Sequence, residues 1–278
     1  LMAMELPMTD RGAEFIRPYR IRARLLLGGA LGTLAAMAPG TAFAQGFNGT
    51  PNVPIGNVNI VNAPNTSTIT VNSNSAIIDW APNAGTFMPA GNTVTYQNGG
   101  GITNFAVLNR IQSATPTNFS GTVNSRINGT PGGTLVFQSP GGIVLGGTAR
   151  FDVGNLVLTT LNVETDVNGE FLGPNNAISF SLGAGDPDAV ILASPGSQIL
   201  ANSENSFVAM LAPGVVPDGN IQVNGSAAFI AAEQVNLTVN QGLFDIEVLT
   251  GSGRDVGISH LGTTGGPGGS SQTDNHRI

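Results

Sequence analysis

Three segments of the chain share a pattern in which an apolar run is followed by Ser-Pro-Gly or Ala-Pro-Gly and then by a second short run. They are LVFQSPGGIVLG (135–146), VILASPGSQILA (190–201) and VAMLAPGVVPDG (208–219). The interval from Pro140 to Pro195 is close to three times the interval from Pro195 to Pro213. A repeat of about 20 residues with one turn dipeptide per unit indicates a solenoid. One rung of a β-solenoid cannot bury its apolar face alone, so stacked rungs create the core.

Strand-like runs occur along the whole body of the chain. Short runs of Val, Ile, Leu, Thr and Phe alternate with Gly, Asn, Pro and Ser, which is typical of strands joined by turns. No amphipathic helical pattern longer than two turns follows residue 44. Runs such as Val190–Leu192 do not alternate strictly, which favours strands stacked in a parallel sheet. The predicted fold class is therefore all-β, a parallel β-helix (β-solenoid) with an N-terminal cap at residues 46–61.

The repeat also gives expectations that can be checked rung by rung. At about 20 residues per rung, residues 53–249 predict about ten rungs. Val157, Leu192 and Met210 lie inside apolar runs, and their side chains are predicted to point into the core.

The charge content limits the classes of function. Charged residues make up 10% of the chain, and all ten basic residues are Arg. From Gln45 onward, five Arg face fourteen Asp or Glu, so the body is acidic. A nucleic-acid binder needs a basic face for the phosphates, so no nucleic-acid partner is predicted. The apolar fraction of 41% argues against disorder, because such a chain can bury a core.

The N-terminal region carries the pattern of an export signal. A basic stretch (17–24) precedes an uncharged, largely apolar run (25–37), and residues 41–44 supply the small-x-small pattern of a cleavage site. This order predicts a signal peptide that the general secretion machinery reads and that is cleaved between Ala44 and Gln45. The apolar run is about 13 residues long, whereas a bilayer-spanning helix needs about 20. No later run is long enough either, so no transmembrane helix is predicted in the mature chain.

The predicted organisation has three parts. Residues 1–44 form the signal peptide, residues 45–250 the strand-rich domain, and residues 251–278 a flexible tail or linker rich in Gly and Ser. Such a tail provides no C-terminal anchor, so the chain is expected to be the leader of a longer protein or a truncated remnant. Without Cys, no disulfide supports the fold.

Candidate catalytic and metal-binding residues are few. His260 and His276 are the two histidines, and both lie in the tail without Cys partners, which disfavours a metal site or a catalytic triad. Asp186 and Asp188 are interpreted as an acidic turn rather than a Ca²⁺ site. Trp80 is interpreted as a core or cap residue rather than a platform for sugar stacking. The sequence therefore predicts no catalytic, cofactor-binding or metal-binding residue and no cofactor.

Five segments occur in the order found in a known family. They are 72–80 (NSNSAIIDW), 106–111 (AVLNRI), 134–146 (TLVFQSPGGIVLG), 151–161 (FDVGNLVLTTL) and 206–213 (SFVAMLAP). In this order they resemble the N-terminal secretion domain of filamentous haemagglutinin-type exoproteins, the exported partners of two-partner secretion systems. The resemblance implies a right-handed parallel β-helix that acts as the non-enzymatic secretion-targeting leader of a large adhesin.

The resemblance also implies a secretion motif. The third segment aligns with the family motif NPNGI, so Ser139, Pro140, Gly141, Gly142 and Ile143 are predicted to form it. Ser139 and Gly141 replace the two Asn residues of the family motif.

Partners and localisation follow from the same resemblance. Asn109 and Arg110, in the second segment, are predicted to take part in transporter recognition. The implied partner is an outer-membrane β-barrel transporter whose periplasmic POTRA domains bind the chain. The protein is expected to pass through the periplasm and outer membrane and to be secreted or displayed on the cell surface of a Gram-negative bacterium. Host or cell-surface glycans are a further candidate partner.

A second class of function shares the predicted fold. Parallel β-helices also include polysaccharide-active enzymes and carbohydrate-binding surface proteins, and fold alone does not separate these functions. A glycosidase needs paired carboxylates in a cleft, and the sparse charge here favours the secretion domain. An adjacent transporter gene would support the secretion domain, whereas activity on pectin or a similar glycan would support the enzyme.

Overall fold

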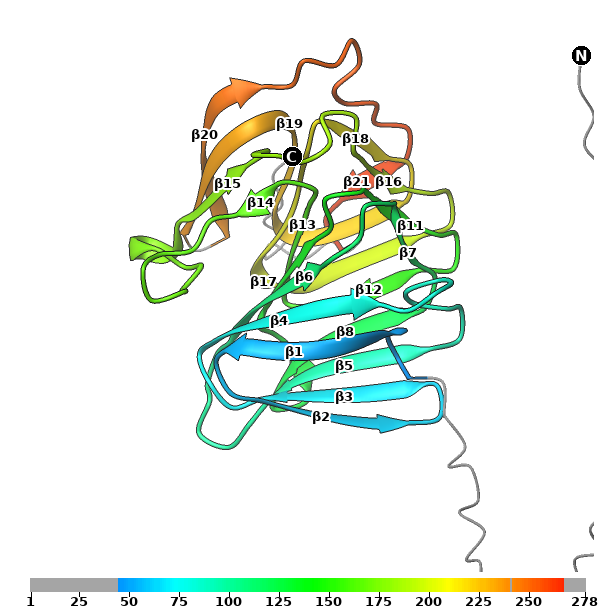
Figure 1. Ribbon diagram of the computed structural model, residues 1–278, viewed down its shortest axis with the longest axis vertical. Helices are drawn as coiled ribbons and strands as arrows, with labels where there is room; N and C mark the ends of the chain where they lie inside the picture. The colour runs from blue at the N-terminus through cyan, green and yellow to red at the C-terminus, as the bar shows by residue number, and fades with distance from the viewer. Residues whose placement is uncertain (1–44, 241, 268–278) are drawn as a thin grey trace, which may run out of the picture. The chain divides into compact units, whose positions relative to one another are not determined.

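The computed structural model describes residues 45–240 and 242–267, and their fold is almost entirely β (Figure 1). The strands are β1 (Gly49–Ile55), β2 (Val58–Ala63), β3 (Thr66–Val71), β4 (Ser75–Pro82), β5 (Thr93–Asn98), β6 (Ala106–Ile111), β7 (Thr117–Phe119), β8 (Thr122–Ile127), β9 (Thr130–Pro131), β10 (Thr134–Gln138), β11 (Ile143–Leu145), β12 (Arg150–Asp152), β13 (Asn155–Thr159), β14 (Asn162–Val163), β15 (Ile178–Ser181), β16 (Val190–Ala193), β17 (Gln198–Ala212), β18 (Gly214–Pro217), β19 (Asn220–Asn240), β20 (Leu243–Gly251) and β21 (Thr263–Gly265). The helical element of this part is one 3-10 turn, η1 (Pro174–Asn176). The predicted all-β class is confirmed.

Two predicted segments lie outside the described residues. They are the signal peptide (1–44), with the cleavage residue Ala44, and the last part of the tail (268–278). Within the described part, no helix has the length and apolar character needed to cross a membrane.

Parallel strands form three faces of a β-helix. The first face stacks β3, β5, β8, β12, the start of β17 (198–201), the start of β19 (220–223) and β21. The second face stacks β4, β6, β10, β13, the end of β17 (206–212) and the middle of β19 (225–231). The third face stacks β7, β11, β16 and β18. The chain passes from face to face in turn, which confirms the predicted β-solenoid.

The rungs are longer than the sequence repeat predicts. Thr66, Thr93, Thr122 and Arg150 occupy equivalent positions in the first face, so one rung extends from each of these residues to the next. The seven strands of this face do not match the predicted ten rungs. The predicted period of about 20 residues, which the solenoid pattern suggested, is therefore wrong.

The reason is that the three Pro-Gly dipeptides do not share one corner. Pro140 follows β10 and Pro213 follows the end of β17, and both lead from the second face to the third. Pro195 follows β16 and leads from the third face to the first. The short interval from Pro195 to Pro213 thus joins two different corners of one rung.

The second face is buried on both sides. Its inward side chains pack in the β-helix core and include Val107, Leu135, Leu156 and Val208. Its outward side chains pack in a second apolar layer and include Leu108, Val136, Val157 and Ala209. A strand covered on both sides needs apolar residues at every position, which explains the runs without strict alternation.

Of the three residues predicted to point into the core, Met210 does so. Val157 is fully buried, but it belongs to the layer on the opposite side of the sheet. Leu192 is half-buried, because Ile191 and Ala193 are the inward residues of β16 and the third face alternates. The prediction for Leu192 is wrong.

An antiparallel sheet, here called the outer sheet, covers the outward side of the second face. It consists of β14, β15, the last part of β19 (232–240) and β20. Its side chains Val163, Phe180, Val235 and Leu237 pack in the second apolar layer. Figure 1 shows β15 and β20 on either side of β19, which runs on from the β-helix into this sheet.

The region predicted to be the N-terminal cap contains β1 and β2. Strand β1 is antiparallel to β4, and β2 is antiparallel to β3. The buried ring of Phe47 lies before β1, with its centroid 4.8 Å from that of Phe87 and 5.2 Å from that of Trp80. This region is therefore anchored in the core.

The stack continues beyond residue 250, into the segment that composition assigned to a tail. Strand β21 pairs in parallel with the start of β19, and Ile258 forms a parallel bridge with Val215. Although this segment is rich in Gly and Ser, its backbone pairs with the β-helix as far as Gly265.

Candidate functional site

The predicted secretion motif forms the turn between β10 and β11. The amide of Gly142 donates to the carbonyl of Ser139 at 3.0 Å, which closes the turn around Pro140 and Gly141. The Ser139 hydroxyl lies 2.7 Å from that of Thr117 inside the protein. The Ser139 amide donates to the Thr159 carbonyl at 3.0 Å, so the turn is fixed to the rungs on both sides.

Two positions of this turn require glycine for different reasons. Gly142 has a φ of +112°, a region that L side chains rarely adopt. Gly141 has no positive φ, but a β-carbon there would overlap the carbonyl carbon of Ala114 and lie 2.5 Å from the amide nitrogen of Thr115. The neighbouring loop therefore leaves no space for the Asn that the family motif has at position 141.

Most of the motif is inaccessible in the folded protein. Ser139, Gly141, Gly142 and Ile143 are buried, and Pro140 is half-buried. A partner that meets the folded chain could contact this turn only through Pro140.

Asn109 points into the β-helix core and is fully buried. Its side-chain oxygen accepts hydrogen bonds from the Tyr96 hydroxyl at 2.6 Å and from the Trp80 indole nitrogen at 3.1 Å. Its amide nitrogen donates to the Val136 carbonyl at 3.3 Å. Burial raises the pKa of the Tyr96 hydroxyl well above its usual value, and the Asn109 hydrogen bond only partly opposes this rise. This network holds the core together and lies away from the surface.

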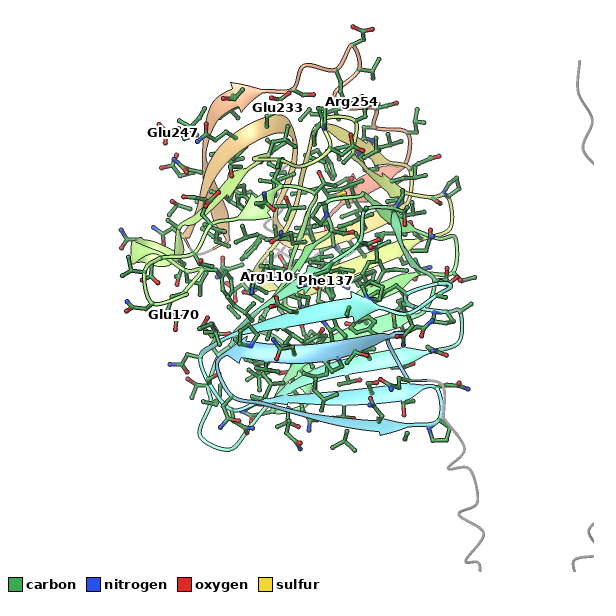
Figure 2. All side chains as sticks on the ribbon, viewed as in Figure 1. Arg110, Phe137, Glu170, Glu233, Glu247 and Arg254 are labelled. Carbon is green, nitrogen blue, oxygen red and sulfur yellow. The ribbon has the colours of Figure 1, made fainter. Side chains whose placement is uncertain are left out.

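Arg110 points to the opposite side of the same strand. Its guanidinium binds both carboxylate oxygens of Asp79 on β4, at 2.6 and 3.0 Å. In the strand register Arg110 lies beside Gln138, the residue before Ser139, so the structure brings Arg110 close to the motif turn. Figure 2 labels Arg110 together with Phe137, which is the inward neighbour of Asn109. Asn109 and Arg110 thus belong to one region but face opposite sides of the sheet.

A surface cavity of about 370 Å³ lies at the same corner as the motif turn. Residues 82–85, Phe87 and the segment 112–118 line it. Ser113 and Thr117 of the second segment also contact the motif turn. Neither loop carries a recognisable motif, so the sequence did not indicate this cavity.

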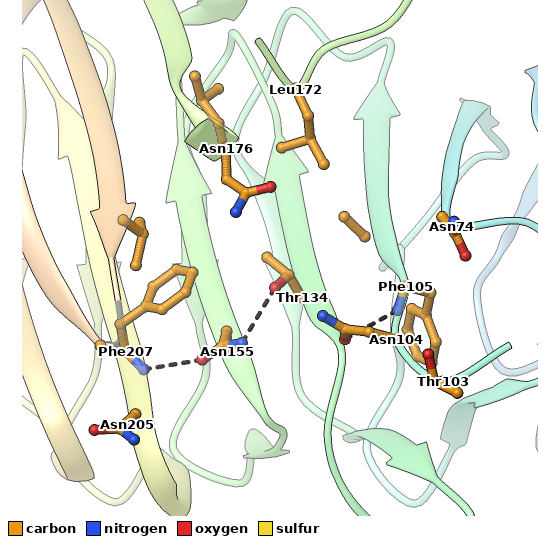
Figure 3. A pocket seen from close by; sticks show the side chains of 14 residues that line it. Asn74, Thr103, Asn104, Phe105, Thr134, Asn155, Leu172, Asn176, Asn205 and Phe207 are labelled. Carbon is orange, nitrogen blue, oxygen red and sulfur yellow. Dashed lines mark hydrogen bonds between the residues drawn. The ribbon is translucent and has the colours of Figure 1, made fainter. Parts of the chain in front are cut away.

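A larger cavity of about 490 Å³ lies between the second face and the outer sheet (Figure 3). Ala106, Thr134, Asn155 and Phe207 line it from the start of the second-face strands. The Asn155 oxygen accepts from the Phe207 amide at 3.1 Å, and the Asn155 nitrogen donates to the Thr134 hydroxyl at 3.1 Å. The sequence did not indicate this cavity either, because its residues come from segments far apart in the chain and form no local motif.

The structure also shows what surrounds the other candidate residues named from the sequence. Trp80 is buried in the core, as interpreted from the sequence. Asp188 forms an exposed ion pair with Arg254 at 3.0 Å. His260 packs against the ring of Phe229, while His276 lies outside the described residues. In the part of the chain with defined placement, no group of three His, Cys, Asp or Glu side chains is arranged to hold a metal ion.

Comparison with known proteins finds solved structures that share this architecture. No protein-family model and no curated protein matches the chain. The crystal structure of the HMW1 secretion domain from Haemophilus influenzae matches with a TM-score of 0.59 and 18% identity, over 79% of this chain and 54% of that one. The filamentous hemagglutinin secretion domain matches with a TM-score of 0.52 and 15% identity, over 79% of this chain and 76% of that one. The chain has the fold of these secretion domains.

The secretion-domain fold confirms the resemblance to filamentous haemagglutinin-type secretion domains at the level of structure. The chain spans about half the length of the HMW1 structure, and identities of 18% and 15% support likeness of fold alone. Residue roles are therefore argued from the geometry of this chain.

Proposed function

We propose that this chain is the non-enzymatic secretion-targeting domain of a large exported adhesin of the haemagglutinin type. The observation that carries the proposal is its secretion-domain fold, which it shares with structures described as secretion domains. The signal peptide (1–44) directs the chain to the general secretion machinery and is removed between Ala44 and Gln45. An outer-membrane β-barrel transporter with periplasmic POTRA domains then carries the chain to the cell surface. Residues 45–250 provide the targeting signal, and residues 251–278, whose first part still pairs with the β-helix up to Gly265, connect it onward.

In this proposal the transporter recognises the chain before it folds. Ser139, Gly141, Gly142, Ile143 and Asn109 are buried in the β-helix but accessible in an extended chain. An extended segment can add a strand to the edge of a partner's sheet. The absence of Cys supports unfolded transit, because no disulfide can close a loop. Five Arg against fourteen acidic residues after the signal favour a basic receptor groove.

The proposal includes two finer points of the fold. The β-helix is right-handed, as are about 98% of crossover connections between parallel strands. The hairpin of β2 with β3 and the antiparallel strand β1 form the N-terminal cap, since antiparallel strands end the parallel stack. Such a cap protects the end of the stack against association with other sheet edges.

The test measures binding between the chain and the purified periplasmic POTRA domains of the proposed outer-membrane transporter. Chain freshly diluted from urea is expected to bind at least about tenfold more tightly than folded chain, a difference of about 1.4 kcal/mol. Gly142→Val is expected to weaken this binding. Gly129→Val is the matched control, because Gly129 also has a positive φ, +85°, but has open space around it.

Three results would contradict the proposal. Absence of binding in both states would reject recognition by this transporter. Equal binding of folded and unfolded chain would reject recognition before folding. Equal losses in the two glycine variants would reject a role for the motif turn.

A further inference from the structure

The cavity between the second face and the outer sheet has a neutral, polar rim. Asn74, Thr103, Asn104, Asn176 and Asn205 line it and are exposed. Among the described residues that line the cavity, none is charged. A ligand with a phosphate or carboxylate group would find no cation here, so the lining selects a neutral ligand.

The rim amides are available to a ligand. The Asn104 oxygen accepts from the Phe105 amide at 3.0 Å, which leaves the Asn104 amide nitrogen free. The side chains of Asn74, Asn176 and Asn205 have no hydrogen-bond partner within the described residues. Each free side-chain amide offers both donors and an acceptor, the combination that adjacent hydroxyl groups of a ligand can satisfy.

The floor of the cavity is apolar. Ala106, Ile178 and Phe207 are buried and form it, with Leu172 and Val239 half-buried beside them (Figure 3). Its volume of about 490 Å³ lies within the usual range for small-ligand sites, about 300–1,000 Å³. A suitable ligand therefore has an apolar face of C–H groups and a polar edge of neutral hydroxyls.

Backbone amides around the floor are already hydrogen-bonded within the protein, and this favours a sugar over a peptide as the ligand. The amides of Ala106, Thr134 and Asn155 donate to the carbonyls of Asn74, Phe105 and Gly133 at 2.8–2.9 Å. A bound peptide strand would need a row of free backbone groups, which this part of the cavity does not offer. Recognition must therefore use the side-chain amides of the rim and the apolar floor.

We propose that this cavity is a binding site for a neutral glycan. Asn74 and Asn205 lie at the two ends of the row β4, β6, β10, β13 and β17, about 19 Å apart, so the ligand is an oligosaccharide rather than a single sugar. Its hydroxyls bind the rim amides of Asn74, Asn104, Asn176 and Asn205, and its C–H faces pack on Phe207 and its apolar neighbours. The inference goes beyond secretion targeting and does not depend on it.

Two Asn residues allow a clean test. Asn176 and Asn205 have positive φ values of 59° and 60°, which glycine adopts readily, so Asn176→Gly and Asn205→Gly remove the amide but suit the backbone. The matched controls are Asn175→Gly and Asn65→Gly, at positions with φ of 59° that do not line the cavity.

The experiment titrates the purified chain with neutral tetrasaccharides built from glucose, galactose, mannose or N-acetylglucosamine, and with sialylated and sulfated forms. At least one neutral probe is expected to bind with a Kd below about 10 mM. Each cavity variant should weaken this binding by about three- to tenfold, the value of one net hydrogen bond, with wild-type affinity in both controls.

Several outcomes would overturn the proposal. These are no binding of any neutral probe, equal affinity in cavity and control variants, or tighter binding of the anionic forms. Loss of transporter binding in the cavity variants, without glycan binding, would assign the cavity to a protein partner and would also overturn it.

Discussion

The hydroxyl of Tyr96 donates a hydrogen bond of 2.6 Å to the side-chain oxygen of Asn109, inside the apolar core and between two faces of the β-helix. The same oxygen accepts from the Trp80 indole nitrogen. One buried amide therefore satisfies polar groups from β4 and β5. In the folded protein this geometry gives Asn109 a role in holding β4, β5 and β6 in register.

Replacing Asn109 is expected to destabilise the fold strongly. Asn109→Leu keeps the volume but leaves the Trp80 and Tyr96 donors buried without an acceptor, at a cost of about 1–3 kcal/mol each. We expect the free energy of unfolding to fall by about 2–5 kcal/mol in urea denaturation followed by fluorescence of the single Trp. The control Asn72→Leu, at an exposed position, should change it by no more than about 0.5 kcal/mol. Equal effects of the two substitutions would refute the core role.

Tyr96 is expected to make stability depend on pH in alkaline solution. Its folded pKa is raised by burial, so the folded state holds the proton more tightly than the unfolded state. This contribution is complete below the unfolded pKa of about 10 and is lost as the pH rises above it. From Gln45 onward the chain has no Lys or Cys and no other Tyr, so no other side chain titrates in this range. Tyr96→Phe should abolish the decline in denaturation midpoint above about pH 10, and an unchanged decline would contradict the assignment.

The double-sided burial of the second face predicts a sharp contrast between two apolar residues. Val157→Asp would place an unpaired charge in the second apolar layer and should lower stability by several kcal/mol. Leu192 lies on the half-buried outward side of the third face, so Leu192→Asp should lower the free energy of unfolding by less than about 2 kcal/mol. Thermal midpoints of both variants provide the comparison. If Leu192→Asp were the more damaging, the assignment of inward and outward sides would be wrong.

The crowding at Gly141 predicts that even one methyl group is harmful in the motif turn. Gly141→Ala should destabilise the domain by about 1–3 kcal/mol, because its β-carbon meets the backbone of the 113–117 loop. Gly100→Ala is the control, since Gly100 has open space around it and no positive φ. The control should be neutral or slightly stabilising. Chemical denaturation of the two variants side by side decides the matter, and equal stability would show that the loop can move aside.

The sequence predicted the fold class because short apolar runs and turn residues follow directly from local chemistry. It did not predict the rung length, since a Pro-Gly dipeptide marks a corner without telling which corner it is. Leu192 was misplaced for a related reason, as an apolar triplet does not reveal whether one or both sides of its strand are covered.

The candidate site was predictable only where a local motif exists. Ser139–Ile143 could be located by alignment, but their burial depends on the 113–117 loop and on Thr159, which are distant in sequence. The cavity that includes Asn74 and Asn205 could not be located, because its residues meet only after the outer sheet folds over the second face.

Export of the chain is expected to depend on the transporter. The full chain is expressed in a Gram-negative host, alone and together with the proposed outer-membrane transporter, and the fraction of the chain outside the outer membrane is measured. We expect the chain to stay in the periplasm without the transporter and to reach the medium or cell surface with it. Equal export in both strains, or periplasmic retention in both, would contradict it.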